Sequence, residues 1–227
     1  MVDRVGLLKG KLIVSCQASP ELPLGNPVML AAMARTAEIG GAAGIRADNP
    51  GNIRAICAAV SVPVLGICKQ HYEGFEPYIT PTVEEVLAAI DAGARLIAVD
   101  GTPRPRPGGC TLADIVAASH ERGVPVMADC STLEDGLFAE QAGADLIGTT
   151  LSGYTPYSPK LPGPDFALIS ALAARCSRPI VAEGRIHRPE QAREAVERGA
   201  FAVVVGTAIT APQAITQWFA EALASAG

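Results

Sequence analysis

Residues 133–149 read LEDGLFAEQAGADLIGT, and the fold prediction begins from this stretch. Leu133–Ala142 has the apolar spacing of an amphipathic helix, and Asp145–Thr149 is a short apolar run of strand length. Gly143, between them, suits the left-handed conformation that closes a helix. The stretch therefore predicts a helix that leads directly into a strand.

The same joint recurs at Ile39-Gly40-Gly41-Ala42, Ala92-Gly93-Ala94 and Arg198-Gly199-Ala200, each followed by a strand candidate. The predicted strands are Leu12–Cys16, Ala43–Arg46, Val64–Cys68, Leu96–Val99, Pro125–Ala128, Asp145–Thr149, Pro179–Ala182 and Ala202–Val205. The predicted helices are Pro27–Ile39, Pro50–Ala59, Val83–Ala92, Leu112–Arg122, Leu133–Ala142, Asp165–Arg175, Pro189–Arg198 and Pro212–Ala224. This number of units favours one closed (β/α)8 barrel, a TIM barrel, over an open doubly wound sheet, which usually has about five to seven strands.

The composition fits one soluble core. The 227 residues suit a single barrel domain spanning residues 1–227. The hydrophobic share is 49% and the aromatic share only 4%, which predicts an interior of Ala, Val, Ile and Leu. Because the net charge is -5 and no basic cluster is interleaved with aromatics, nucleic acid is not expected as a partner.

The six cysteines show no CxxC and no paired histidine spacing, which argues against a metal site and predicts reduced, mostly buried thiols. The sequence has no signal-peptide core and no run of about 18 apolar residues. We therefore expect a cytoplasmic protein that makes no membrane contact. The oligomeric state stays open, and a homo-oligomer is compatible with the sequence.

Polar residues follow or close every predicted strand, at the barrel end where such folds carry their active sites. They are Gln17, Arg46, Lys69, Asp100, Asp129, Thr149, Thr150, Glu183, Gly206 and Thr207. Each one alone is explained by a strand that emerges into water. Their convergence on one rim makes them candidates for a site.

Lys69 and Glu183 are the candidates for acid–base chemistry. Lys69 follows an apolar strand end, and a lysine held against an apolar barrel mouth can have its pKa lowered towards neutrality. Glu183 also leaves an apolar strand and can face that amine across the mouth. The alternatives are a solvated lysine and a carboxylate that only neutralises Arg185 or Lys69.

Two glycine-containing turns are candidates for binding a phosphate. Gly184-Arg185 follows the seventh strand and Gly206-Thr207 the eighth, where backbone N–H groups and a helix N-terminus favour an anion. Thr210 and Pro212 suit the start of the last helix. Each glycine taken singly is equally well explained as the end of a strand.

Several segments together suggest a family. They are Gly44–Ala47, Pro63–Lys69, Tyr78–Thr82, Met127–Thr132, Gly148–Thr155 and Ala182–Ile186. They resemble the N-acylglucosamine-6-phosphate 2-epimerases, also called N-acetylmannosamine-6-phosphate 2-epimerases, and the likeness runs from Cys16 to the last helix. Gly148–Pro156 and Ala182–Ile186 are specific, whereas Val205–Ile209 occurs in many phosphate-binding barrels.

The resemblance implies interconversion of N-acetylmannosamine 6-phosphate and N-acetylglucosamine 6-phosphate in sialic acid or mannosamine breakdown, without metal or organic cofactor. By position, Lys69 would move the C2 proton, and Glu183 would assist it or orient the sugar. Gln17, Arg46 and Asp129 would hold sugar hydroxyls or the acetamido group. The other substrate-binding residues expected are Tyr154, Gly184, Arg185, Gly206 and Thr207.

One departure from the family pattern concerns the phosphate. The family often has an arginine in the turn that here reads Thr210-Ala211-Pro212, and alanine cannot replace its charge.

Two other kinds of function stay open. One is another sugar-phosphate barrel enzyme, of the ribulose-phosphate 3-epimerase or thiamine-phosphate synthase type, which would lack the Gly148–Pro156 run. The other is a non-catalytic sugar-phosphate sensor.

Overall fold

The computed structural model describes residues 4–225, and they form a closed barrel of parallel strands. The strands follow one another in chain order, and β1 pairs with β8 to close the ring. They are β1 (Leu12–Cys16), β2 (Gly44–Asp48), β3 (Val64–Ile67), β4 (Leu96–Asp100), β5 (Val126–Asp129), β6 (Leu146–Gly148), β7 (Ile180–Glu183) and β8 (Ala202–Val205). The prediction of a single (β/α)8 barrel is confirmed, and the open sheet is excluded.

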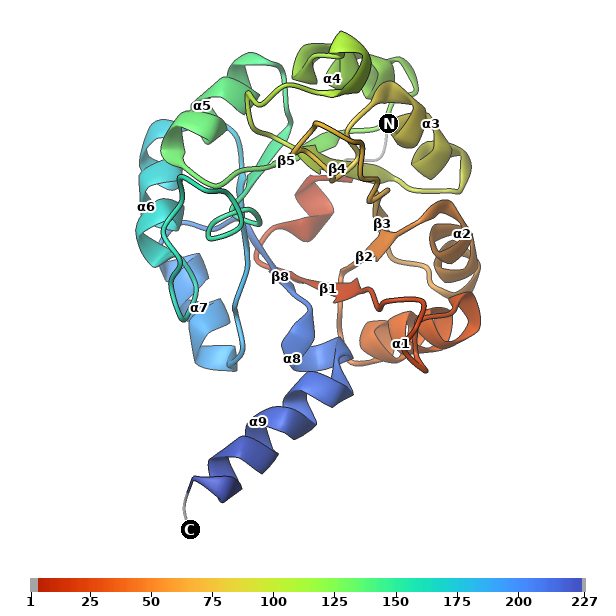
Figure 1. The fold of residues 1–227 in the computed structure, drawn as a ribbon, viewed down its shortest axis with the longest axis vertical. Helices are drawn as coiled ribbons and strands as arrows, with labels where there is room; N and C mark the ends of the chain where they lie inside the picture. Colours follow the sequence, from red (N-terminus) through yellow and green to blue (C-terminus); the bar gives the residue numbers. More distant parts are fainter. Residues whose placement is uncertain (1–3, 226–227) are drawn as a thin grey trace.

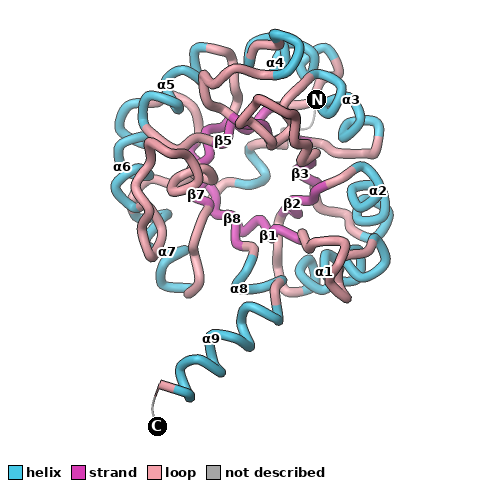
Figure 2. Tube along the Cα trace, viewed as in Figure 1, coloured by secondary structure: helices cyan, strands magenta, loops and turns pink. Residues whose placement is uncertain are grey.

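Helices surround the strands (Figure 1), and Figure 2 shows the strands as an inner ring. The helices are α1 (Pro27–Ile39), α2 (Pro50–Ala59), α3 (Val83–Asp91), α4 (Leu112–Glu121), α5 (Leu133–Gln141), α6 (Phe166–Arg175), α7 (Pro189–Glu197), α8 (Thr207–Thr210) and α9 (Pro212–Ala224). Two short 3-10 helices are η1 (Gly6–Leu8) and η2 (Pro107–Gly109). Helix α9 points away from the barrel (Figure 1), although its Trp218 packs on His187.

Most of the predicted boundaries agree with the structure to within one residue, and three larger points need correction. The second strand was expected to end at Arg46, but β2 continues because Asp48 still pairs with Ile67 of β3. The one-turn helices η1, η2 and α8 were not predicted, because a single turn has too few residues to show a period. Thr210 was expected at the start of the last helix, but it ends α8, and Ala211 precedes α9.

The connection between α5 and β6 at Gly143 has the expected conformation. Gly143 has φ 95°, and the next residue, Ala144, donates its N–H to Ala139 O at 3.1 Å. The start of α5 is fixed as well, since Thr132 and Asp135 each accept the other's backbone N–H. These local bonds fix where α5 begins and ends, and therefore where β6 enters the barrel.

Two apolar layers hold the barrel together. Because successive strand residues point to opposite faces, Ile13 of β1 lies inside the barrel while Val14 packs outward against the helices. Further residues of the inner cluster are Leu65, Leu96, Met127, Leu146, Val181 and Val204. The core consists mainly of Ala, Val, Ile and Leu, as the composition predicts. The filled interior leaves only the carboxyl ends of the strands for polar side chains.

Candidate active site

A cavity of about 310 Å³ opens at the carboxyl ends of the strands. Its walls are formed by Ser15, Gln17, Arg46, Ile67, Lys69, Tyr78, Ile79, Thr150, Leu151, Tyr154, Glu183, Gly184, Arg185, Ile186, His187, Val204, Gly206, Thr207, Thr210 and Ala211. The predicted catalytic and substrate-binding residues are all among them except Asp129, whereas the strand-end candidates Asp100 and Thr149 are not. Asp129 is fully buried at the end of β5 and is bound to Arg46.

The floor of the cavity contains an arginine held by two carboxylates. Arg46 is 1% exposed, and its Nη1 and Nη2 donate to Asp129 Oδ1 at 3.1 Å and Oδ2 at 2.5 Å. Nη1 also donates to Glu183 Oε2 at 2.7 Å. Burial alone would lower the pKa of Arg46, but the charges of Asp129 and Glu183 raise it above its usual range. The guanidinium is therefore a fixed positive charge beneath the cavity.

Glu183 takes a partner other than the expected lysine. Its carboxylate forms an ion pair with Arg46, which reaches across the barrel from β2. Thr150 Oγ1 lies 3.1 Å from Glu183 Oε2 and 2.6 Å from Asp129 Oδ1, so its one hydrogen can serve either carboxylate. Burial raises the pKa of Glu183, with a further contribution from Asp129, while Arg46 opposes the rise. A raised pKa suits a group that exchanges protons.

Lys69 projects into the cavity from the chain that follows β3. Its main chain forms an antiparallel bridge with Ile79, and its Nζ donates to Gln17 Oε1 at 2.7 Å. Gln17 in turn donates to Ser15 Oγ at 2.8 Å. The side chain remains accessible from the open mouth, yet the surrounding atoms desolvate it and lower its pKa, while the nearby Asp48 carboxylate acts in the opposite direction. The direction agrees with the sequence prediction.

The Arg185 guanidinium is turned towards the loop between β6 and α6. Its Nε donates to Gly163 O at 2.8 Å and its Nη1 donates to Ser152 O, so it ties both ends of that loop to the rim. The backbone at Gly184 and Arg185 is in the left-handed region, with φ 112° and 54°. This conformation places a turn at the cavity wall. Two of the Arg185 nitrogens, Nε and Nη1, are occupied by hydrogen bonds to the loop.

The turn after β8 supplies the adjoining part of the wall, because β8 pairs with β7. Gly206 precedes the one-turn helix α8, whose first N–H groups have no acceptor within the helix. A Cβ at Gly206 would lie 3.3 Å from the Ser15 side chain, so the glycine permits a close approach of β1 and β8. Ala211 also lines the cavity, at the position where the resemblance leads one to expect an arginine.

Several cavity residues are not predicted by the sequence, among them Ser15, Tyr78 and His187. Ser15 lies inside β1, where no strand-end rule selects it, although the alternation of the strand could have placed it inward. Tyr78 is brought to the wall by the bridge between Lys69 and Ile79, for which the sequence has no local signal. His187 packs on Trp218 of α9 with ring centroids 4.6 Å apart, a contact that only the fold reveals.

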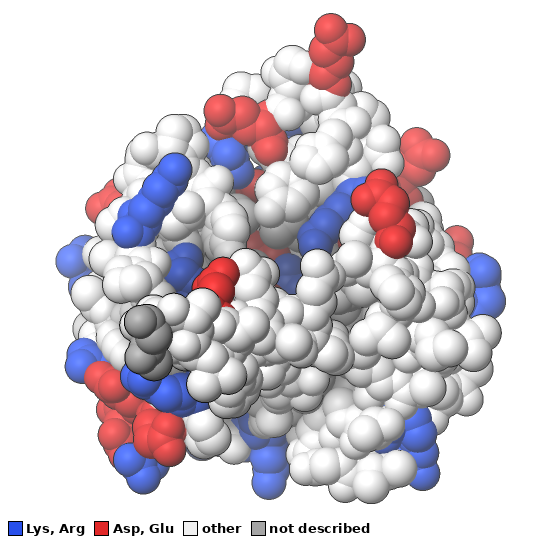
Figure 3. Space-filling view, turned by 60° about the horizontal axis from the view of Figure 1, so that its bottom comes forward, with Lys and Arg blue, Asp and Glu red and all other residues white. Residues whose placement is uncertain are grey.

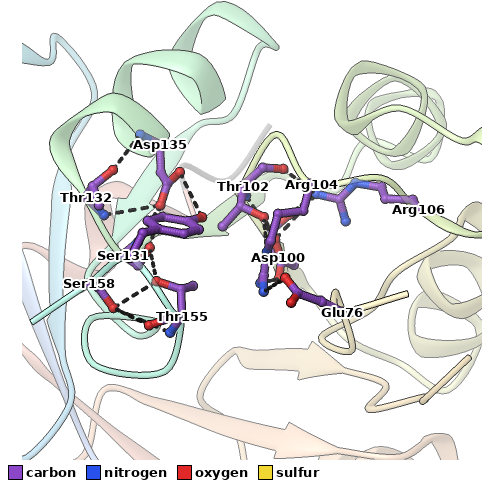
Figure 4. A network of polar contacts seen from close by, with 11 residues as sticks. Glu76, Asp100, Thr102, Arg104, Arg106, Ser131, Thr132, Asp135, Thr155 and Ser158 are labelled. Carbon is purple, nitrogen blue, oxygen red and sulfur yellow. Dashed lines mark hydrogen bonds and ion pairs between the residues drawn. The ribbon is translucent and has the colours of Figure 1, made fainter. Parts of the chain in front are cut away.

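Asp100, another strand-end candidate, belongs to a separate network outside the cavity (Figure 4). Its Oδ2 accepts from Arg104 Nη2 at 2.7 Å, and its Oδ1 accepts from Thr102 Oγ1 at 2.6 Å. Arg104 also binds Glu76 at 3.1 Å. These contacts fold the loop after β4 back on its strand, so Asp100 organises a loop and lies outside the candidate site.

The other half of Figure 4 explains part of the Gly148–Pro156 run. Thr155 Oγ1 donates to Ser131 Oγ at 2.9 Å, and Ser131 donates to the buried Asp135 carboxylate at 2.6 Å. The loop after β6 is thereby attached to the start of α5. This attachment sets the position of Tyr154, which lines the cavity although it is 63% exposed.

The remaining polar features point to no further centre. Within residues 4–225, no group of three or more His, Cys, Asp or Glu side chains is arranged to hold a metal ion. The six cysteines are unpaired, and Cys16, Cys68 and Cys130 are buried. None of the helices in the described part of the chain has the length and apolar character needed to cross a membrane. On the face in Figure 3, basic and acidic side chains are interspersed.

Residues 30–225 match the family model described as "Putative N-acetylmannosamine-6-phosphate epimerase". This chain belongs to the N-acetylmannosamine-6-phosphate 2-epimerase family. A putative 2-epimerase of this name from Caldanaerobacter subterraneus subsp. tengcongensis is 53% identical over 96% of this chain and 93% of its own length. One from Cutibacterium acnes is 51% identical over 97% of each chain.

Solved structures agree with this membership. The N-acetylmannosamine-6-phosphate 2-epimerase from Clostridium perfringens superimposes with a TM-score of 0.94 at 44% identity, covering 96% of this chain and 95% of that one. A thiamine phosphate pyrophosphorylase from Pyrococcus furiosus superimposes with a TM-score of 0.62 at 18% identity, covering 94% of this chain and 92% of that one. The second likeness shows a shared barrel alone.

Proposed function

We propose that this chain, as one barrel domain spanning residues 1–227, interconverts N-acetylmannosamine 6-phosphate and N-acetylglucosamine 6-phosphate in amino-sugar catabolism. The observation that carries the proposal is the arrangement around one small cavity. Lys69, an amine of lowered pKa, and Glu183, a carboxylate of raised pKa, share the cavity with the fixed charge of Arg46. Membership of the epimerase family supports the same chemistry.

The reaction needs one proton to leave and return at C2. In the open-chain aldehyde this proton is α to the carbonyl, so the neutral amine of Lys69 can take it, and the C2–H electron pair becomes the double bond of an enolate. The proton then returns to the other face of C2 and restores the carbonyl. The bound positive charge of Arg46 favours the enolate oxygen. No electrons are lost or gained, so these steps need no redox cofactor.

The neighbouring residues position the base and the sugar. Gln17 Oε1 accepts a hydrogen bond from the Lys69 amine. When the sugar binds, a substrate hydroxyl can replace Gln17 as the acceptor. Asp129 is fully enclosed, so its proposed role is to hold Arg46, while the exposed Tyr154 ring covers the sugar. Glu183 orients the substrate or passes a proton.

The phosphate has its best support at the turns after β7 and β8. The left-handed turn at Gly184 and Arg185 and the first turn of α8 after Gly206 and Thr207 bring backbone N–H groups to the cavity wall. Ala211 adds no charge there. We therefore propose a phosphate held mainly by backbone amides, with a weaker grip than an arginine would provide.

An NMR assay in D2O tests the proposal. With N-acetylmannosamine 6-phosphate as substrate, we expect the 2-epimer as product, with deuterium at C2 because the lifted proton exchanges with solvent. Lys69→Met retains the stem of the side chain and should lower kcat at least about a hundredfold. Binding of the sugar without any epimer would instead indicate a sensor. Product free of C2 deuterium after many turnovers would contradict the enolate.

We also propose that two copies of the chain exchange helix α9. None of the α9 residues is buried, and Phe219 and Leu223 are 70% and 76% exposed. Beside α7 and the outer face of β8 lies a groove of about 420 Å³ that is lined mainly by apolar side chains, including Val196, Val203 and Ile209. The groove occupies the place in the helix ring that α9 leaves empty (Figure 1), so α9 of a second copy is its proposed occupant.

Light scattering combined with size exclusion tests the exchange. The unaltered chain should elute as a dimer, and Phe219→Glu combined with Leu223→Glu should give monomers, because the charges cannot enter an apolar groove. Gln217→Lys, a polar change on the same helix, is the control and should leave the dimer intact. A monomeric unaltered chain at micromolar concentration would overturn the proposal.

A cytoplasmic location is part of the proposal as well. The six unpaired cysteines suit a reducing compartment.

A further inference from the structure

A second cavity, of about 410 Å³, adjoins the first at Lys69. Gln17 and Lys69 line both cavities, so this hydrogen-bonded pair forms part of the wall between them. Asp48, the last residue of β2, lines only the second cavity. A sugar in the first cavity therefore meets Lys69 and Gln17 without meeting Asp48.

Asp48 is bound directly to the proposed base. Its Oδ1 accepts the backbone N–H of Lys69 at 2.9 Å, just beyond the point where Asp48 pairs with Ile67 in the sheet. This bond fixes the main chain at the start of the lysine side chain. None of the ion pairs found within residues 4–225 involves Asp48, whereas Asp129 and Glu183 are both held by Arg46. The Asp48 charge thus lacks a cationic side chain in direct contact.

Four charged groups have the largest effects on the Lys69 amine. Asp48 and Arg46 come from β2, Asp129 from β5 and Glu183 from β7. Burial and Arg46 disfavour the ammonium form, and the three carboxylates favour it. Asp48 has the largest influence of the charged groups on the pKa of Lys69, whereas the carboxylates of Asp129 and Glu183 are paired with the Arg46 guanidinium.

We infer that Asp48 is a positioning residue for Lys69, which fixes its main chain and supplies the negative charge that sets the strength of the amine as a base. Without that charge, burial and Arg46 would weaken the base that must take the C2 proton. With it, the amine remains basic enough to remove a weakly acidic proton. The inference rests on the proposed function, in which Lys69 is the base.

Asp48→Asn separates the charge from the hydrogen bond, because the amide oxygen can still accept the Lys69 N–H. Removal of the negative charge destabilises the ammonium, so the pKa of Lys69 should fall. The acidic limb of the kcat/KM profile should move about one pH unit lower. The kcat on the high-pH plateau should fall by up to about tenfold as the base weakens, while KM changes less than about twofold. A purely structural role would lower activity without moving the limb.

Glu84→Gln is the matched control. Glu84 also lines the second cavity, but it has no hydrogen bond to Lys69 and is not among the four charged groups with the largest effects on that amine. The same loss of one negative charge there should leave the profile in place. An equal shift in both variants would overturn the inference, because it would report the net charge of the cavity and not the contact with Asp48.

A direct titration distinguishes failure of this inference from failure of the proposed function. The rate at which acetic anhydride labels Lys69, measured by mass spectrometry across pH, reports the pKa of its amine without any turnover. A lower pKa in Asp48→Asn than in the unaltered chain supports the inference, even if no epimer forms and the proposed reaction fails. Identical labelling curves for the two proteins would overturn it, even if the epimerase assay succeeds.

Discussion

Asp100 ends β4 and Asp129 ends β5, and the two residues pair in the register of the sheet. Both are fully buried, and both bind arginine. The difference lies in where the arginine comes from. Arg104 and Arg106 belong to the loop that follows Asp100, whereas Arg46 reaches Asp129 from a strand 83 residues earlier in the chain.

This difference decides what each aspartate does. An arginine from the adjacent loop closes that loop, and the Asp100 network remains at the edge of the barrel (Figure 4). An arginine from across the barrel must pass beneath its open end, and Arg46 therefore presents its charge to the cavity. The same pair of residue types organises a loop in one place and places a charge beside the cavity in the other.

Asp129→Asn should have the largest effect. It leaves Arg46 buried with one carboxylate fewer, and breaking such a pair typically costs about 3–5 kcal/mol of unfolding free energy. Because Arg46 also loses its orientation, kcat should fall at least about a hundredfold. Urea unfolding and the epimerase assay measure the two effects. A stable variant with unaltered kcat would remove Asp129 from the site.

Asp100→Asn is the matched change on the other strand. It should cost about 2–4 kcal/mol of unfolding free energy, because Arg104 and the buried Arg106 lose their carboxylate. The kcat should remain within about threefold of the unaltered value, because no residue of this network lines the cavity. A loss of activity comparable to that of Asp129→Asn would break the distinction between the two networks.

Ala211→Arg adds an arginine at the turn before α9, in addition to those from strand β2 and from the loop after β4. If the 6-phosphate lies beside this turn, the new charge should lower KM for the phosphorylated sugar about five- to thirtyfold, which corresponds to about 1–2 kcal/mol. The unphosphorylated sugar should be nearly unaffected in the same assay. An equal change for both sugars would place the phosphate elsewhere in the cavity.

Thr150→Val should have the smallest effect. Valine keeps the shape of threonine but removes the hydroxyl that reaches both Asp129 and Glu183. We expect kcat/KM to fall about three- to tenfold, the scale of one hydrogen bond. Thr102→Val removes the corresponding hydroxyl beside Asp100 and should leave kcat/KM unchanged. If both variants lose activity equally, the hydroxyls act through overall stability.

The sequence predicts which residues lie at the rim but not which of them pair. The ends of the strands follow from local apolar runs, and the barrel rule then places Lys69, Asp129 and Glu183 at one end. Their partners depend on the length and direction of side chains that cross the barrel. Glu183 was therefore expected to face Lys69, whereas Arg46 is long enough to reach it from β2.

Helix α9 shows the same limit on a larger scale. The pattern of Pro212–Ala224 predicts its helix correctly, since the periodicity of a helix is local. Its direction depends on the short helix α8 and on Ala211 between the two helices, and neither leaves a periodic signal. An apolar face predicts that a helix packs against another surface, but it does not predict which surface that is.

The bond between Thr210 Oγ1 and Ser15 O, 2.7 Å long, joins residues 195 positions apart at the seam where β8 meets β1. During synthesis on a ribosome, β1 is the first strand to emerge, and β8, which pairs with β1 to close the barrel, is the last. Until then the partly made sheet has two open edges, which other chains can join. The turn at Gly206 does not exist at that stage either, so a nascent chain acquires the wall proposed to bind phosphate only as the seam closes.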